Sequence, residues 1–301
     1  MPTPDPLARP LEAALAAARA AAALLDEAWR SREPLHVDSK GCHDYVTQVD
    51  RRSEALIVGV LRAACPEIGV LGEEGTGLDL DAPLLWVVDP LDGTSNFIHG
   101  YPAFAVSIGL VEREVDAIPA PTAPLRFPAL LGRRAVLGVV ADVCQRQLFH
   151  ASRGAGAWRR ALPADLDTPL PAAERLRVGP APRLEDAFWA TGFPIRHKDL
   201  ARLYLNLFDA LMPPSAGVRR GGSAALDLAY TAAGVFDAFV ELNLAPWDVA
   251  AGVCLVAEAG GVVRGLPVAG VEDRRPLAGG HLAAGNPALV EDLLGRLGGR
   301  L

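Results

Sequence analysis

The chain has 301 residues, 50% of them hydrophobic and 22% charged, and its formal net charge at pH 7 is −7. This composition excludes intrinsic disorder as the main state, and the length suits one large domain or two modest ones. The acidic balance argues against a nucleic-acid partner, whose phosphates would need a basic surface. It still permits a phosphorylated small molecule, because bound divalent cations supply positive charge locally.

The cysteines and the apolar segments indicate the cellular setting. The four cysteines lie far apart, without a C-x-x-C pair or a nearby histidine cluster, so we expect reduced thiols and neither disulfides nor a zinc site. No apolar run approaches the roughly 18 residues that a membrane-spanning helix requires. We therefore expect a soluble, cytoplasmic protein without a membrane partner.

Two helices are predicted near the N-terminus. In residues 11–29, apolar side chains recur every three or four positions, and the many alanines favour a helix. A second helix should begin at Thr47, because Thr47 and Asp50 have the spacing of a capping box. Pro66 should end this helix.

Short apolar runs bounded by Gly, Pro and Asp follow, and they predict strands of a sheet. The runs lie at residues 69–71, 84–88, 104–111, 136–143 and 147–150. Between two of these runs, residues 112–134 contain four prolines, which are incompatible with a central strand or a continuous helix. We expect a surface excursion there.

Beyond about residue 180, predicted helices and strands alternate. Helices are expected at residues 199–211, 223–233 and 247–259, with a strand at residues 236–241. A last helix should follow Asn286 as its N-cap, with Pro287 as its first residue.

An acidic motif follows the second apolar run directly, in the order Asp89, Pro90, Leu91, Asp92, Gly93, Thr94. Carboxylates at the end of a buried strand are costly unless a cation neutralises them. The two aspartates and the main-chain carbonyl of Leu91 can converge on hard cations, while the amides of Gly93 and Thr94 can face an anion. The motif therefore predicts a metal site beside a phosphate site, although such residues alone also form an ordinary Asp-Gly turn.

Further acidic residues have simple structural explanations when each is taken alone. Glu73 and Glu74 lie between two glycines after the first apolar run, where a pair of glutamates is usually solvated. Asp248 follows Pro246 and Trp247 at the start of an apolar helix, where an aspartate usually caps the helix or responds to its dipole. Asp50 has a similar capping explanation.

Three motifs, taken together and in this order, resemble the inositol monophosphatase family: Gly72-Glu73-Glu74, residues 89–94, and Trp247-Asp248-x-Ala-Ala-Gly. Its members are magnesium-dependent, lithium-sensitive phosphatases. The resemblance extends from Lys40 and Asp44, which match a mobile family loop, to Asn286. It implies a layered αβαβα sugar-phosphatase fold, α+β in residues 1–178, which carry the proline-rich insertion 112–134, and α/β in residues 179–301. A homodimer is implied only by the resemblance.

The resemblance also implies the roles of individual residues. Two or three Mg²⁺ would be held by Glu73, Asp89, the Leu91 carbonyl, Asp92 and Asp248, so these side chains must meet in the fold. Thr94, supported by Asp50 and with Glu73 close by, would orient and deprotonate the attacking water. The implied substrate contacts are Gly93, Thr94, Arg219, Gly222, Ser223, Ala224 and Glu241. Because no Ser-His-Asp or reactive-cysteine arrangement is visible in the sequence, phosphoryl transfer should go directly to water.

The implied activity is the hydrolysis of inositol 1-monophosphate, a small phosphorylated polyol. Ser95-Asn96-Phe97 favours the inositol branch over the adenosine-bisphosphate branch, which tends to carry a lysine there. A histidinol-phosphate phosphatase is the alternative, and a fructose-1,6-bisphosphatase or nucleotide phosphatase of the same superfamily is a further option. A non-catalytic scaffold is disfavoured because the acidic set is intact.

Overall fold

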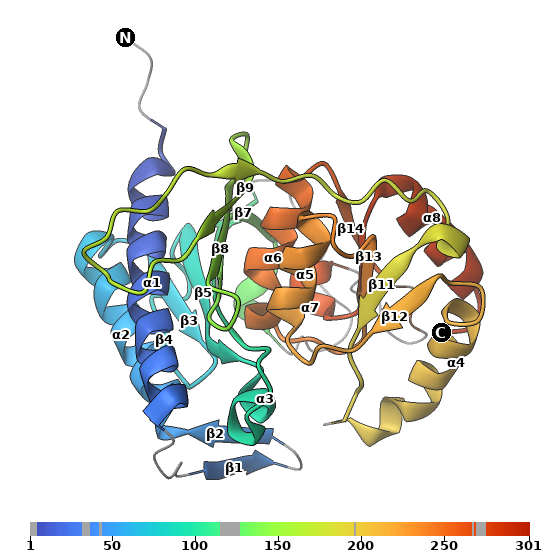
Figure 1. Ribbon diagram of the computed structural model, residues 1–301, viewed down its shortest axis with the longest axis horizontal. Coiled ribbons are helices and arrows are strands. Elements are labelled where there is room, and N and C mark those ends of the chain that lie inside the picture. Colours follow the sequence, from blue (N-terminus) through green and yellow to red (C-terminus); the bar gives the residue numbers. More distant parts are fainter. Residues whose placement is uncertain are drawn as a thin grey trace.

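The computed structural model describes residues 5–31, 37–41, 44–114, 127–195, 197–266, 268 and 275–301. Its elements stack in five layers that alternate between helices and sheets (Figure 1). One helix pair covers the outer face of the large sheet, a second pair lies between the two sheets, and a third covers the small sheet. These pairs are α1 (Ala8–Ser31) with α2 (Gln48–Ala64), α5 (Ala224–Ala232) with α6 (Pro246–Glu258), and α4 (Ala201–Leu211) with α8 (Pro287–Leu297). The predicted αβαβα architecture is confirmed.

The large sheet has eight strands in the order β10-β9-β8-β7-β6-β5-β3-β4. Only β3 and β5 pair in parallel, and all its other neighbours are antiparallel. The strands are β3 (Gly69–Gly72), β4 (Gly77–Leu78), β5 (Leu84–Asp92), β6 (Ala105–Arg113), β7 (Arg133–Asp142), β8 (Gln147–Ser152), β9 (Gly156–Ala161) and β10 (Glu174–Arg175).

The small sheet has five strands in the order β12-β11-β13-β15-β14 and mixes both directions. Its strands are β11 (Phe188–Thr191), β12 (Gly217–Arg219), β13 (Ala238–Glu241), β14 (Val262–Gly265) and β15 (Leu282–Gly285). A separate hairpin and several short helices complete the fold. They are β1 (Val37–Gly41), β2 (Asp44–Thr47), α3 (Thr94–His99), α7 (Pro276–Gly279), and the 3-10 turns η1 (Pro128–Leu130), η2 (Leu184–Asp186) and η3 (Lys198–Leu200).

The predicted helices are confirmed, with shifts of a few residues at their ends. Thr47 is the N-cap of α2, and the reciprocal bonds of a capping box with Asp50 are present. The proline-rich excursion is shorter than predicted, because Glu112 pairs with Arg134 and Arg113 with Arg133 across β6 and β7. These residues continue the ladder, so the excursion lies within residues 114–132, of which 115–126 lie outside the described residues.

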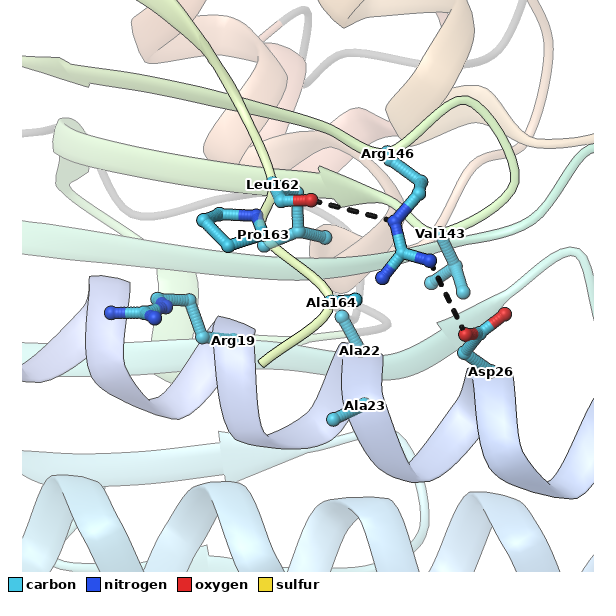
Figure 2. A pocket seen from close by; sticks show the side chains of 9 residues that line it. All are labelled: Arg19, Ala22, Ala23, Asp26, Val143, Arg146, Leu162, Pro163 and Ala164. Atoms are coloured by element: carbon cyan, nitrogen blue, oxygen red, sulfur yellow. Dashed lines mark hydrogen bonds and ion pairs between the residues drawn. The ribbon is translucent and has the colours of Figure 1, made fainter. Parts of the chain in front are cut away.

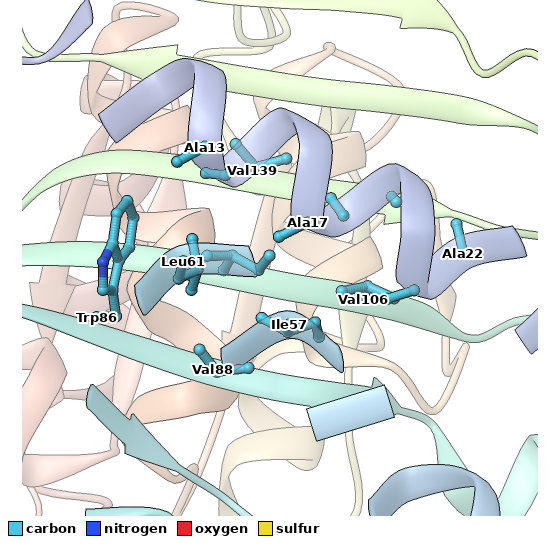
Figure 3. Close-up of a cluster of buried hydrophobic side chains, with 14 of the residues drawn as sticks. Ala13, Ala17, Ala22, Ile57, Leu61, Trp86, Val88, Val106 and Val139 are labelled. Carbon is cyan, nitrogen blue, oxygen red and sulfur yellow. The ribbon is translucent and has the colours of Figure 1, made fainter. Parts of the chain in front are cut away.

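Apolar faces of α1 and α2 form one core with the large sheet. Figure 3 shows alanines of α1 and Ile57 and Leu61 of α2 packed against Trp86 and other strand side chains. The small alanine side chains of α1 allow its backbone to approach the sheet closely. None of the helices in the described ranges combines the length and the apolar character that crossing a membrane requires.

Polar contacts connect α1 with the turn before β8 and with residues 162–168, which follow β9. Arg146 forms an ion pair with Asp26 at 3.7 Å and contacts the Leu162 carbonyl at 3.5 Å (Figure 2). Arg19 donates to the carbonyls of Leu166 and Thr168 at 2.7 Å each. The pocket between these residues has a volume of about 10 Å³, which holds no more than one water molecule. It is therefore a packing feature and no ligand site.

Glycines let α6 lie directly on the large sheet. Gly109 of β6 and Gly138 of β7 are register partners. A Cβ added to Gly109 would lie 2.6 Å from the Ala250 Cβ, and one added to Gly138 would lie 2.2 Å from the Ala251 carbonyl oxygen. No larger residue fits this approach without moving the helix.

The change from one sheet to the other falls between Arg175 and Phe188, around the predicted boundary at residue 178. However, α5 and α6 belong to the C-terminal part of the sequence and pack against β6 and β7 of the large sheet. One core cluster therefore contains residues from both parts, such as Val140 and Leu255. The division into two halves stays a prediction.

His150 of β8 is buried, and its Nε2 accepts a hydrogen bond from the Arg160 side chain at 3.0 Å. Burial, and then the charge of Arg160, lower the pKa of His150 from 6.5 to about 4. Between pH 6.5 and about pH 4, His150 is protonated in the unfolded chain and neutral in the folded chain. The free energy of unfolding therefore falls as the pH falls through this range. We expect His150 to lower the free energy of unfolding by about 2 kcal/mol at pH 5 relative to pH 8.

Urea unfolding at both pH values checks this expectation. In His150→Gln, the glutamine oxygen can accept the same hydrogen bond without titrating, so the variant should lose less stability between pH 8 and pH 5. An identical loss in the variant and the unmodified protein would contradict the assignment.

Candidate active site

The acidic motif lies at the end of β5, the strand that pairs with both β3 and β6. Its pairing with β6 shifts between Asp89 and Asp92, where Pro90 cannot donate a ladder hydrogen bond. The Leu91 amide donates to Asp89 Oδ1 at 3.0 Å, and Gly93 turns the chain into α3 with a φ of 95°. The register shift lies between the two aspartates, which pair with Ser107 and Ala105 of β6, and both carboxylates reach one place.

Carboxylates from three parts of the chain meet here. Oxygens of Asp89, Asp92 and Asp248 lie within 4.8 Å of one another, with Asp248 coming from the first turn of α6. Glu73, at the end of β3, is hydrogen-bonded to Asp89. Burial, and then the neighbouring charges of Glu73, Asp92 and Asp248, raise the pKa of Asp89 well above its ordinary value. The structure thus brings together the four acidic side chains that the sequence analysis grouped.

Protein donors hold two of these carboxylates in position. Asp92 Oδ2 accepts hydrogen bonds from the Ser223 hydroxyl at 2.6 Å and from the Ala225 amide at 2.7 Å. Asp248 Oδ2 accepts one from the Ala245 amide at 2.7 Å. Such bonds fix the direction of a carboxylate, as they do around metal ligands. The oxygen-only donor set also suits Mg²⁺, which prefers carboxylate and carbonyl oxygens.

Thr94 lies beside this cluster at the start of α3. Its hydroxyl donates to Asp50 Oδ1 at 3.0 Å and lies 3.1 Å from the Leu91 carbonyl oxygen. Asp50 is 1% exposed, and its Oδ2 accepts bonds from the Thr47 hydroxyl at 2.6 Å and the Thr47 amide at 2.9 Å. Burial raises the pKa of Asp50, and the hydrogen bonds from Thr47 and Thr94 oppose this effect. Asp50 therefore caps α2 and also contacts Thr94.

A cleft of about 440 Å³ opens beside the aspartates. Among the expected substrate contacts, those on its wall are Gly93, Thr94, Gly222, Ser223, Ala224 and Glu241. Asp92 and Asp248 lie on the same wall, so the cleft connects the carboxylate cluster with the small sheet. Residues outside this set of expected contacts, such as Asn96, Phe193 and Asn243, also line it.

Glu241 ends β13 and directs its carboxylate against Gly192, where any Cβ would overlap it. Burial, and then the charges of Asp227 and Asp248, raise the pKa of Glu241 well above its ordinary value. Asp227 is itself a buried carboxylate on α5, near Gly221 and absent from the sequence expectations. A single aspartate within a helix carries no sequence signal that separates it from a surface residue.

Arg219 does not line the cleft, which corrects its expected position. Its guanidinium lies over the Phe188 ring, 4.6 Å from the ring centre. The next residue, Arg220, lines the cleft and lies over Phe193 at 5.4 Å. Successive side chains of a strand point to opposite faces, and β12 ends at Arg219, so the neighbouring arginine faces the cleft. The Arg-Arg sequence alone does not distinguish the two.

The loop between Glu241 and Asp248 is held by the segment that precedes β15. The Asn243 amide donates to His281 Nδ1 at 3.1 Å, and the Leu244 amide donates to the Gly280 carbonyl at 2.7 Å. These bonds fix the loop that joins Glu241 to Asp248, and with it the distance between these two residues of the candidate site. The side chains of Lys40 and Asp44, which match the mobile family loop, lie outside the described residues.

Comparison with known proteins decides the family. The model of the inositol monophosphatase family matches residues 7–123 and 129–295. The chain belongs to the inositol monophosphatase family. The short gap in this match falls in the proline-rich excursion, where the chain departs from the family pattern.

Relatives match this family member over almost its whole length. A Pseudomonas aeruginosa protein named Nus factor SuhB is 42% identical in an alignment of 289 residues that covers 94% of each chain. The extragenic suppressor protein SuhB from Bartonella henselae has a TM-score of 0.79 at 36% identity, covering 96% of this chain and 98% of that chain. An inositol monophosphatase from Anabaena has a TM-score of 0.73 at 32% identity, covering 95% and 94%.

Proposed function

We propose that this member of the inositol monophosphatase family is a magnesium-dependent phosphate-monoester hydrolase that transfers the phosphoryl group directly to water. The observation that carries the proposal is the meeting of Asp89, Asp92 and Asp248 beside a cleft that Asp92 and Asp248 line. The membership of the family supports it. An all-carboxylate cluster beside a cleft suits phosphate esters, whose negative charge requires a cationic counterpart.

The proposed metal ligands are Glu73, Asp89, the Leu91 carbonyl, Asp92 and Asp248, around two or three Mg²⁺. When bound, Mg²⁺ supplies positive charge for the ester and lowers the pKa of water. The Thr94 hydroxyl donates a hydrogen bond to Asp50. The lone pairs of the Thr94 hydroxyl oxygen can therefore accept a hydrogen bond from the attacking water. Asp50, with its raised pKa, is a stronger base than an exposed carboxylate and suits this position. Glu73 is proposed to lie close to the same water.

The proposed substrate is a small phosphorylated polyol, first of all myo-inositol 1-phosphate. Glu241 is a carboxylate acceptor on the cleft wall and suits the hydroxyls of such a ring. Gly222, Ser223 and Ala224 line the same wall. The amides of Gly93 and Thr94, at the start of α3, are the proposed contacts of the phosphate.

Phosphate release from a panel of esters tests both the chemistry and the substrate. Myo-inositol 1-phosphate should be hydrolysed with added Mg²⁺, and EDTA should stop the reaction because the carboxylate cluster then has no cation. Histidinol phosphate, fructose 1,6-bisphosphate and a nucleotide monophosphate should react more slowly. Faster hydrolysis of histidinol phosphate by orders of magnitude would contradict the polyol assignment, and no hydrolysis of any ester would contradict the enzyme proposal.

A second function is suggested by the relative named Nus factor, which is 42% identical to this chain. This name gives no support to the expectation that the chain lacks a nucleic-acid partner. We propose that the chain also has a binding role that does not require hydrolysis. Affinity capture from its own cells with unmodified protein and with Asp92→Asn should recover the same partner, and a partner lost in the variant would contradict an independent role. A homodimer remains a proposal, and sedimentation of the purified protein tests it.

A further inference from the structure

Polar side chains on one face of α2 contact two segments of the candidate site, the acidic motif 89–94 and the turn of residues 72–76. Asp50, Ser53 and Glu54 are 1%, 0% and 4% exposed. Their spacing of three and four residues places them on the same side of the helix. Asp50 accepts the bond from Thr94, and the Ser53 hydroxyl donates to the Pro90 carbonyl at 2.9 Å. Glu54 has no role in the hydrolysis proposed above.

Glu54 binds the turn that carries Glu73. Its Oε2 accepts a hydrogen bond from the Glu74 amide at 2.7 Å. Its Oε1 accepts bonds from the Thr76 amide at 3.1 Å and the Thr76 hydroxyl at 2.5 Å. Both oxygens of this buried carboxylate are therefore satisfied by one short turn, which compensates for the cost of burying the charge.

The same turn lies directly against the Glu54 carboxylate. A Cβ on Gly72 would lie 2.4 Å from Glu54 Oε2, so the close approach requires glycine there. The Gly72 amide donates to the Thr76 carbonyl at 2.8 Å, and the Glu73 amide donates to the Val88 carbonyl of β5 at 3.1 Å. The backbone of Glu73 is thus bonded to the strand that carries Asp89, and the amide of the next residue, Glu74, is bonded to Glu54.

We propose that Glu54 is a positioning residue of the metal site, which holds the turn of residues 72–76 so that Glu73 faces Asp89. This proposal rests on the proposed function, in which Glu73 is a metal ligand. Without the carboxylate of Glu54, the amides of Glu74 and Thr76 lose their acceptor and the turn has other conformations available. In most of these the Glu73 side chain no longer points at the aspartates. Glu54 touches neither the metal nor the substrate and acts through Glu73.

Calorimetric titration with Mg²⁺ alone tests the proposal without relying on activity. In Glu54→Gln, the amide nitrogen faces backbone donors, so we expect binding to the metal site to weaken 10- to 100-fold, the range found for residues that orient metal ligands. Glu67→Gln is the matched control, because it removes the same charge from an exposed side chain paired with Arg9. It should bind Mg²⁺ like the unmodified protein. Thr76→Val, which removes one donor to Glu54, should weaken binding in the same direction and less strongly.

The Glu73→Gln background separates positioning from general damage to the fold. If Glu54 acts through Glu73, adding Glu54→Gln to Glu73→Gln causes no further weakening of Mg²⁺ binding. Equal weakening in both backgrounds, or unchanged binding in Glu54→Gln, would overturn the proposal. If the unmodified protein binds Mg²⁺ and hydrolyses no phosphate ester, only the proposed function fails. If the unmodified protein binds no Mg²⁺, both fail.

Discussion

Replacing Asp92 by asparagine should lower kcat/KM for phosphate-ester hydrolysis at least about 10³-fold, or ~4 kcal/mol of transition-state stabilisation, and leave the chain folded. Asp92 belongs to the carboxylate cluster and also accepts bonds from Ser223 and Ala225 on one oxygen. The single oxygen of asparagine can keep those bonds, which places its amide nitrogen toward the cluster. An amide nitrogen is a poor ligand for Mg²⁺, so the proposed metal site loses a donor.

The stability of this variant should depend on the metal. Asp92 is one of the charges that raise the pKa of Asp89, so its neutralisation relieves repulsion when no cation is bound. We therefore expect the melting temperature in EDTA to stay the same or rise. The increase that Mg²⁺ causes in the unmodified protein should shrink, because binding to the folded state is weaker.

Asp209→Asn is the control for this substitution, because it removes the same charge from an exposed side chain of α4. Its activity and its response to Mg²⁺ should match those of the unmodified protein. Phosphate release by Asp92→Asn at near the normal rate, with the normal dependence on Mg²⁺, would refute the metal assignment.

Local signals in the sequence predict the helices and the carboxylate cluster well. The capping box at Thr47 depends only on residues three apart, and Pro246 marks the start of α6 in the same local manner. The cluster itself is a long-range feature, but each acid follows a recognisable strand end or helix start. Periodicity does not predict that these acids meet in the fold. The order of the motifs and their resemblance to a family do.

The sequence predicts only one strand of the small sheet, for a physical reason. Strands such as β11, β14 and β15 have four residues each, too few for a period of two to be distinguished from other apolar runs. In β15, the sequence Leu-Ala-Ala-Gly has no β-branched residue and suggests no strand by itself. Its partners β13 and β14 decide its conformation, and they lie apart from it in the sequence.

Residues that support the site also carry no signal in the sequence. Glu54 has the surroundings of a surface residue in the sequence, between Ser53 and Ala55 within a charged helical segment. Its role depends on a turn about 20 residues further along the chain, and only the packing of α2 against the large sheet at β5 reveals the contact. Which of Arg219 and Arg220 faces the cleft is likewise hidden in the sequence, because the pairing of β12 in the small sheet determines it.

Introducing alanine at Gly138 should lower the free energy of unfolding by about 4 kcal/mol, and alanine at Gly59 should raise it by about 1 kcal/mol. At Gly138, the new methyl group would lie 2.2 Å from the Ala251 carbonyl oxygen and 2.8 Å from the Ala251 Cα. These are backbone atoms of α6, so relief requires the helix to move. At Gly59, on the exposed side of α2, no described atom beyond the adjacent residues and the backbone of the helix itself lies within 4 Å of the new methyl group. Only the better helix propensity of alanine then counts.

The movement of α6 adds a functional consequence that Gly59→Ala lacks. Asp248 lies in the first turn of α6 and meets Asp89 and Asp92 only while the helix stays on the sheet. Gly138→Ala should therefore lose phosphatase activity and Mg²⁺ affinity even below its melting temperature, whereas Gly59→Ala should keep both. Urea unfolding, with phosphate release measured on the same samples, checks the pair. Unchanged stability and activity in Gly138→Ala would mean that α6 does not depend on this glycine for its position, and that the glycine pair of β6 and β7 does not set the geometry of the site.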